Sequence, residues 1–250
     1  MYLFGGDRPW DASQFTASDD RVRGGKSQSY LTVLNGPEAA ASQAQFSGNL
    51  DITALGGAGF ASQRTADDVP GWDVSGYDVL VLDVARADSR KYTLTLKDEI
   101  LPRRPDGRDQ STVSWEYDFV VGAGAGAGAG EGHATGSGST AGSTLLVIPF
   151  GDFQPTYRGK PKPDAEPLDL KNVKRVSFMM RSFFGTQEGD FSIVFNSVAV
   201  EKRDKLRDGS IDSVAAAKLV RDGQQRADSS ASKGGSTLAS WFGKLCGWGR

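Results

Sequence analysis

The residue types that most often perform catalysis are scarce in this chain of 250 residues. Its one histidine, His133, lies in a low-complexity segment of glycine and alanine, and its one cysteine, Cys246, lies near the C-terminus. A nucleophilic site needs its base held within hydrogen-bonding distance of the nucleophile, which a glycine-rich segment does not provide. Zinc is disfavoured too, because carboxylates alone rarely form a zinc site. The sequence therefore predicts a protein that is not an enzyme and has no metal site or cofactor.

Adjacent carboxylates are the remaining candidates for acid–base chemistry. They occur as Asp19/Asp20, Asp67/Asp68 and Asp98/Glu99. A glycosidase needs two carboxyl groups roughly 5 to 9 Å apart across a cleft. Neighbouring acids on a strand point to opposite faces, and acids in turns usually cap the backbone or face solvent. We expect these pairs to stabilise turns.

Three aromatic residues offer a different kind of site. Trp72, Trp115 and Tyr117 would suit the stacking of a sugar if they formed an exposed row, and they would equally suit a hydrophobic core. Trp115 and Tyr117 share one face of a strand by alternation. Packing in the core is the favoured interpretation, and a carbohydrate- or small-ligand-binding module is the alternative.

The elements that would position such groups are short strands. Apolar and polar residues mostly alternate in short runs, and turn residues separate the runs. Strands are expected over residues 29–34, 45–52, 59–64, 79–84, 92–96, 112–119, 145–150, 173–181 and 190–201. A long loop is expected over 154–167, because its prolines cannot donate to a central strand. This pattern predicts an all-β fold, an antiparallel β-sandwich.

Composition divides the chain into two parts. Residues 1–203 are expected to form the β-sandwich domain, with a flexible Gly/Ala-rich insert over 122–144. The tail, residues 204–250, is expected to hold short helices and linkers. Residues 201–250 contain ten Lys/Arg and six Asp/Glu, so their net charge is +4 and that of the first 200 residues is −6.

The end of the tail has an amphipathic pattern. Leu238, Trp241, Phe242 and Leu245 fall on one face of a helix. Such a face suits a membrane surface or a groove on a partner, and it suits equally the docking of the tail on its own domain. Cys246 is expected to be a small apolar residue there, with palmitoylation as an alternative.

Overall charge and the N-terminal residues bear on partners and location. The net charge of −2 argues against nonspecific nucleic-acid binding by the whole chain. The first twenty residues contain Asp7, Asp11, Asp19 and Asp20, which an acid-poor mitochondrial presequence would lack. Taken alone, this pattern favours a cytoplasmic protein.

Several motifs, in order and at similar spacing, resemble the thirty-kilodalton complex I intermediate-associated protein family. They cover about residues 15–200 and lie at 18–29 (SDDRVRGGKSQS), 46–50 (FSGNL), 59–64 (GFASQR), 73–78 (DVSGYD), 148–159 (IPFGDFQPTYRG) and 167–169 (PLD). The resemblance implies a galactose-binding-like jelly-roll sandwich. It also implies an assembly factor, or chaperone, that binds intermediates of mitochondrial NADH:ubiquinone oxidoreductase and has no catalytic residues.

Such a factor is expected to bind its protein clients through loops at the ends of the sandwich, because a rigid scaffold positions them. The candidate residues are Arg23, Arg64, Tyr157 and Arg158. Arginine donates paired hydrogen bonds to carboxylates, and tyrosine offers a rigid amphipathic contact. For each of them the alternative is a local role, such as a salt bridge that fastens a loop.

Overall fold

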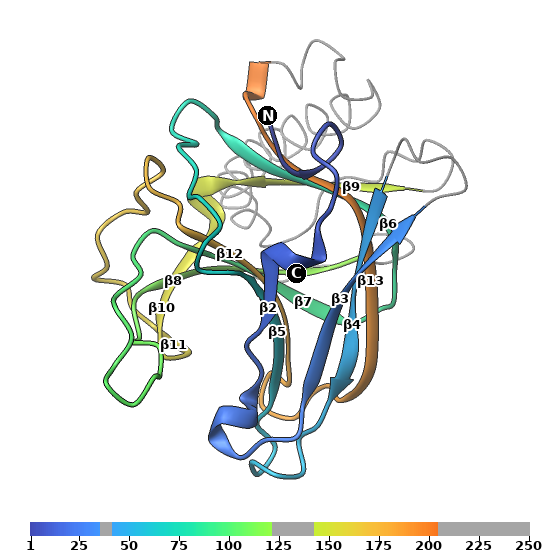
Figure 1. Cartoon of the computed structure of the whole chain (residues 1–250), viewed down its shortest axis with the longest axis vertical. Helices are drawn as coiled ribbons and strands as arrows, with labels where there is room; N and C mark the ends of the chain where they lie inside the picture. The colour runs from blue at the N-terminus through green and yellow to red at the C-terminus, as the bar shows by residue number, and fades with distance from the viewer. Residues whose placement is uncertain (36–41, 122–142, 205–250) are drawn as a thin grey trace, which may run out of the picture.

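The computed structural model describes residues 1–35, 42–121 and 143–204, which form two antiparallel sheets stacked face to face (Figure 1). The first sheet has the strand order β3 (Gln28–Asn35), β4 (Ser42–Leu50), β13 (Gly189–Glu201), β6 (Val79–Ala87) and β9 (Thr144–Pro149). Strand β1 (Tyr2–Gly5) also pairs with β13.

The second sheet carries the groups that form the candidate site. Its order is β11 (Lys160–Pro161), β10 (Gln154–Tyr157), β8 (Ser114–Val120), β7 (Lys91–Lys97), β12 (Arg175–Arg181), β5 (Phe60–Thr65) and β2 (Phe15–Ala17). Three short 3-10 helices join the strands: η1 (Ala12–Gln14), η2 (Asp20–Arg23) and η3 (Phe150–Asp152). The all-β jelly-roll sandwich expected from the sequence is confirmed.

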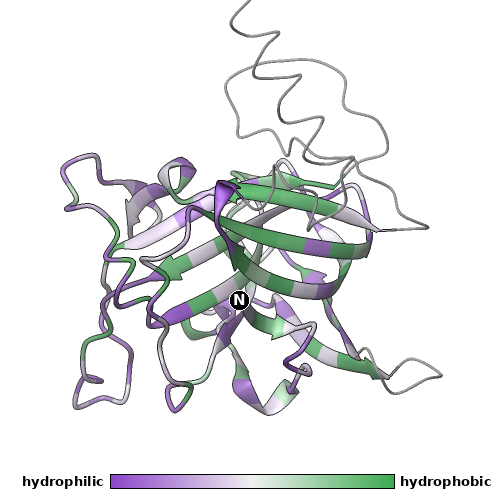
Figure 2. Cartoon of the chain, turned by 90° about the horizontal axis from the view of Figure 1, so that it is seen from above, coloured by the Kyte–Doolittle hydropathy of each residue, from purple (hydrophilic) through white to green (hydrophobic). Residues whose placement is uncertain are grey.

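The core lies between the two sheets and is rich in aromatic rings. Phe178 of β12 stacks on Phe195 of β13 with ring centroids 4.6 Å apart, which joins the centres of the sheets. Strand β13 buries Phe191 and Phe195, and it buries Val198 after a register shift against β6 between Phe195 and Ser197. An extra residue in a strand shifts the alternation by one position, so both halves of β13 face the core. Hydrophobic residues accordingly follow the strands, and hydrophilic residues gather in the loops (Figure 2).

The aromatic residues considered for sugar stacking belong to this core. Trp115 and Tyr117 share the inner face of β8 and are 8% and 5% exposed. Trp72 is half-buried and stands edge-on to Phe4, at 5.5 Å between ring centroids. The core interpretation is therefore confirmed, and these rings form no exposed row.

The proline-rich segment differs from the expected loop. Residues 154–161 form the hairpin β10–β11, which pairs with β8 at the edge of the second sheet. Pro161 lies in the edge strand β11, and Pro155 precedes the two residues of β10 that pair with β11, so both prolines are tolerated. Arg158 and Gly159 connect the strands with φ values of 54° and 76°, which suits a two-residue turn of type I′.

Several expectations lie outside the described residues. They concern His133 and most of the insert 122–144, Cys246, and the amphipathic face of Leu238, Trp241, Phe242 and Leu245. Among the helices that the structure does describe, none has the length and apolar character needed to cross a membrane.

Candidate functional site

A hollow of about 690 Å³ lies beside the edge of the second sheet formed by β2 and β5, between the η2 turn and the loop that follows β7. We refer to it as the arginine hollow, because five of its eleven lining residues are arginines. The arginines are Arg21, Arg23, Arg64, Arg103 and Arg108, and the two acidic residues are Asp19 and Asp109. The lining residues therefore carry a formal net charge of +3.

Asp20 holds the η2 turn, which forms one side of the hollow, through buried hydrogen bonds. Its carboxylate is fully buried and accepts hydrogen bonds from the backbone N–H of Ser27 (3.1 Å), the Ser27 hydroxyl (2.7 Å) and the backbone N–H of Phe60 (3.0 Å). A side chain at Gly25 would collide with this carboxylate, and Gly24 has a φ of 85°. The turn therefore needs both glycines.

Asp19 fastens the same turn to two strands. Its carboxylate accepts from the Ser29 hydroxyl of β3 (2.6 Å), the Ser29 N–H (3.2 Å) and the Ser62 N–H of β5 (2.9 Å). For Asp19 and Asp20, the structural role expected from the sequence is confirmed. Held in this way, the turn presents Arg21, Val22 and Arg23 to solvent, and Val22 is 77% exposed.

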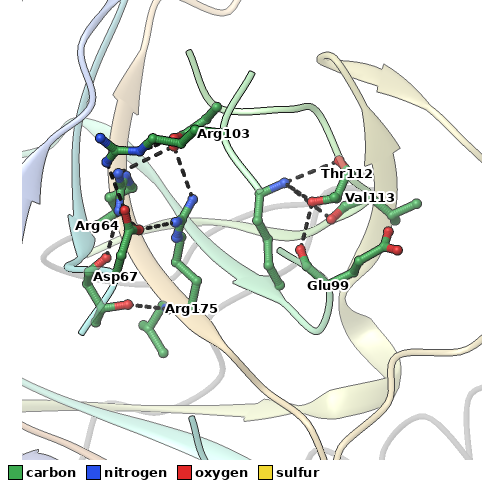
Figure 3. A network of polar contacts seen from close by, with 11 residues as sticks. Arg64, Asp67, Glu99, Arg103, Thr112, Val113 and Arg175 are labelled. Atoms are coloured by element: carbon green, nitrogen blue, oxygen red, sulfur yellow. Dashed lines mark hydrogen bonds and ion pairs between the residues drawn. The ribbon is translucent and has the colours of Figure 1, made fainter. Parts of the chain in front are cut away.

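Asp67 gathers three arginines on the opposite side (Figure 3). Its carboxylate contacts Arg64 at 2.8 Å, Arg103 at 2.8 Å and Arg175 at 2.6 Å. Burial alone would raise the pKa of Asp67, but Arg64, followed by Arg175, brings that pKa below its ordinary value. Because Arg64 and Arg175 are themselves buried, this ion network fixes one wall of the hollow.

Asp109 completes the network from the loop after β7. It lies 3.3 Å from Arg64, 3.3 Å from Arg103 and 3.6 Å from Arg175. Three guanidinium groups thus share two carboxylates, which leaves one positive charge uncompensated within the network. Arg21 and Arg23, across the hollow, add two more.

The four residues proposed from the sequence occupy two places. Arg23 and Arg64 both line the hollow. Arg23 is exposed, with its guanidinium 5.7 Å from the centroid of the Phe60 ring. Arg64 is 8% exposed and ion-paired, which matches the alternative of a salt bridge that fastens a loop. Tyr157 and Arg158 lie on the β10–β11 hairpin and do not line the hollow.

The hairpin nevertheless touches the loop that forms the far wall. The Nε of Arg158 donates to the Ser111 hydroxyl at 3.3 Å, two residues beyond Asp109. The Arg158 guanidinium also lies 5.3 Å from the centroid of the Tyr157 ring, and Tyr157 is 38% exposed. This pair extends the accessible polar surface next to the hollow.

Sequence reasoning missed Arg21, Arg103 and Arg108. The pattern Arg-Val-Arg before two glycines was a usable signal for Arg21, since a turn exposes it beside Arg23. The charged, proline-flanked stretch 102–109 signalled a loop but not its position. Only the folded chain shows that this loop faces the η2 turn.

The chemistry available here is the binding of anionic groups. Arginine forks form paired, charge-assisted hydrogen bonds with carboxylates or phosphates. Over the described ranges, no group of three or more His, Cys, Asp or Glu residues is arranged to hold a metal ion.

Comparison with known proteins places the chain in a family. A family model described as complex I intermediate-associated protein 30 matches residues 3–127 and 137–195. The chain belongs to the complex I intermediate-associated protein 30 family. The matched ranges include every residue that lines the arginine hollow.

The chain is also similar to an uncharacterized protein of Schizosaccharomyces pombe, with 37% identity over 198 residues. The aligned residues cover 79% of this chain and 82% of the relative. Among solved structures, the chain is similar to the family 11 carbohydrate-binding module of the cellulase Lic26A-Cel5E of Clostridium thermocellum. The TM-score is 0.48 at 14% identity, covering 81% of this chain and 94% of the module. The family 11 module of Clostridium thermocellum in complex with a mixed-linked tetrasaccharide gives a TM-score of 0.46 at 14% identity, covering 76% and 89%.

Proposed function

We propose that this protein is a non-enzymatic assembly factor that binds intermediates of mitochondrial respiratory complex I. The family match, which extends over both sheets, is the observation that carries the proposal. A factor of this kind covers surfaces of its client that would otherwise aggregate, so it needs a stable scaffold with accessible loops. The proposal places the protein in mitochondria, at least while it acts.

The binding surface in this proposal consists of the arginine hollow and the neighbouring β10–β11 hairpin. Arg23, Tyr157 and Arg158 are exposed and available to a partner. Arg64 is assigned a positioning role, because its charge is already engaged by Asp67 and Asp109. Rigid strands support each of these loops, which lowers the entropy cost of binding.

A test is to delete the gene in an organism that contains complex I and to measure assembly of the enzyme on native gels. The expected result is accumulation of membrane-arm intermediates and loss of the assembled enzyme, both restored by the wild-type chain. Normal assembly in the deletion strain would contradict the proposal. A diverged protein-binding role outside mitochondria would then be the better description.

The carbohydrate-binding alternative required an exposed row of aromatic rings, and the structure does not provide it from the three candidate residues. Trp115 and Tyr117 are buried and Trp72 is half-buried against Phe4. An exposed row of rings is what a sugar would stack on. Since no specific observation favours this alternative, we do not propose it as a second function.

A further inference from the structure

We propose that the arginine hollow binds an acidic peptide segment of the client protein, whose carboxylates pair with the exposed arginines. The inference rests on the proposed function and specifies the chemistry of the partner. It is carried by three observations: the unequal pairing of charges in the hollow, its size and shape, and the charge of the rest of the molecule.

The first observation separates structural arginines from available ones. Arg64 is buried and held by Asp67 and Asp109. Within the described part of the chain, no ion pair engages Arg21 or Arg23, and the Arg23 guanidinium lies over the Phe60 ring. Two exposed guanidinium groups therefore stand on one rim with their donors free for a ligand.

The opposite rim adds a weakly engaged cation. Arg108 lies 3.9 Å from Asp106, and the two side chains are 75% and 54% exposed. Exposed ion pairs of this kind stabilise a protein little, so a ligand carboxylate competes with Asp106 easily. The hollow thus presents available arginines on both rims.

The size and shape of the arginine hollow also suit a short peptide. A volume of about 690 Å³ lies within the range of ligand sites and accommodates several residues of an extended peptide. The 77% exposed Val22, between Arg21 and Arg23, gives an apolar contact on the rim. Paired carboxylates with an adjacent apolar side chain are therefore the ligand features that match this surface.

The third observation distinguishes a protein segment from larger polyanions. The chain has a net charge of −2, and its first 200 residues carry −6. A negative molecule repels a nucleic acid or an anionic membrane at long range, and a local positive site can still pair with a short acidic segment. The aspartates in the lining, Asp19 and Asp109, further limit how much negative charge the hollow accepts.

The test uses the full-length protein and two fluorescent peptides, one rich in glutamate and one with glutamine in place of each glutamate. Binding is measured by fluorescence anisotropy for the wild type, for R21E/R23E, and for R8E/R86E. R8E/R86E is the control, because it makes the same change in net charge at two exposed arginines outside the hollow. Thermal melting of each variant verifies that it is folded, and R108E provides a second, independent change in the hollow.

The wild type is expected to prefer the glutamate peptide by at least about tenfold, and this preference should fall as salt is raised above about 0.1 M. R21E/R23E should lose at least about tenfold in affinity and R108E severalfold, while R8E/R86E should change by less than about threefold. Equal binding of the two peptides, or equal losses in R21E/R23E and R8E/R86E, would overturn the inference.

Two further probes decide between classes of partner. Single-stranded DNA or phosphatidylserine vesicles that bound the hollow more tightly than the peptide would also overturn the inference.

Capture of the client from mitochondria separates the inference from the function on which it rests. If wild type and R21E/R23E capture complex I subunits equally, the inference fails and the proposed function stands; if the wild type captures none, the proposed function fails.

Discussion

At the scale of single residues, Asp20 is a buried carboxylate that accepts hydrogen bonds from two backbone N–H groups and a hydroxyl. We expect Asp20→Ala to lower the free energy of unfolding by about 3 kcal/mol, because the buried N–H of Ser27 and the part-buried N–H of Phe60 would lose their acceptor. Urea unfolding measures the change. Asp68→Ala, at an exposed position, is the matched control and should stay within about 0.5 kcal/mol of the wild type. Equal effects of the two substitutions would show that Asp20 does not fasten the turn.

Lys97 gives a prediction about pH. Burial, followed by the charge of Arg175, lowers the pKa of Lys97 from its ordinary 10.5 to about 8. Below pH 8 the lysine is charged in both states and the folded state bears the cost of burying it. Between about pH 8 and 10.5 the unfolded state binds a proton that the folded state has lost, so stability rises with pH.

The comparison that isolates this effect is wild type against Lys97→Met. We expect the stability of the wild type to rise relative to the variant by about 1–2 kcal/mol between pH 7 and pH 10. Denaturant unfolding at several pH values measures the difference. Parallel curves for the two proteins would mean that the hydrogen bonds of the Lys97 ammonium to Thr112 and Val113 keep its pKa at the ordinary value.

At the scale of elements, the β10–β11 hairpin carries Arg158 in its turn. Its Nε is 3.3 Å from the Ser111 hydroxyl and the side chain is exposed, so it adds little to stability. We expect Arg158→Ala to leave the melting temperature nearly unchanged and to weaken capture of the client. Arg158→Lys, which keeps the charge but loses the fork, should retain part of the capture. A fall of many degrees in Arg158→Ala would instead show that the residue is structural.

The turn between β12 and β13 contains backbone strain. Phe183 and Phe184 have φ values of 44° and 60°, and the Phe184 side chain is fully exposed. Because glycine adopts positive φ without a Cβ clash, Phe184→Gly should stabilise the protein by about 0.5–1 kcal/mol. Differential scanning calorimetry measures the gain. A lower melting temperature would mean that the phenylalanine makes a contact that offsets its strain.

The sequence predicted the long strands well and the short ones poorly. Alternation over seven or more residues, as in β7 and β12, marks one buried face, whereas β1 and β2 have four and three residues and show no clear period. The prolines hid β10 and β11 from the sequence pattern, because whether a proline is tolerated depends on which strands lie beside it, and only the folded chain shows that. The sequence predicted only two arginines of the hollow, Arg23 and Arg64, because the position of the others also depends on the tertiary fold. Arg21, Arg64 and Arg103 come from three distant segments, and only folding brings them together.

At the scale of the whole molecule, the protein is an acidic sandwich with a basic hollow beside one sheet. The two aspartates of the η2 turn and the Asp67–Asp109 network fix the walls, and the exposed arginines remain available. The negative charge of the rest of the sandwich favours selectivity for a short acidic segment over polyanions. The proposed role in complex I assembly rests on the family match.

The most direct measurement is localisation of the endogenous, C-terminally tagged protein with affinity capture from the same cells. We expect the protein to be recovered from mitochondria together with subunits of NADH:ubiquinone oxidoreductase. A protein found only in the cytoplasm, with none of these subunits, would contradict the assembly role and leave the fold as the established part.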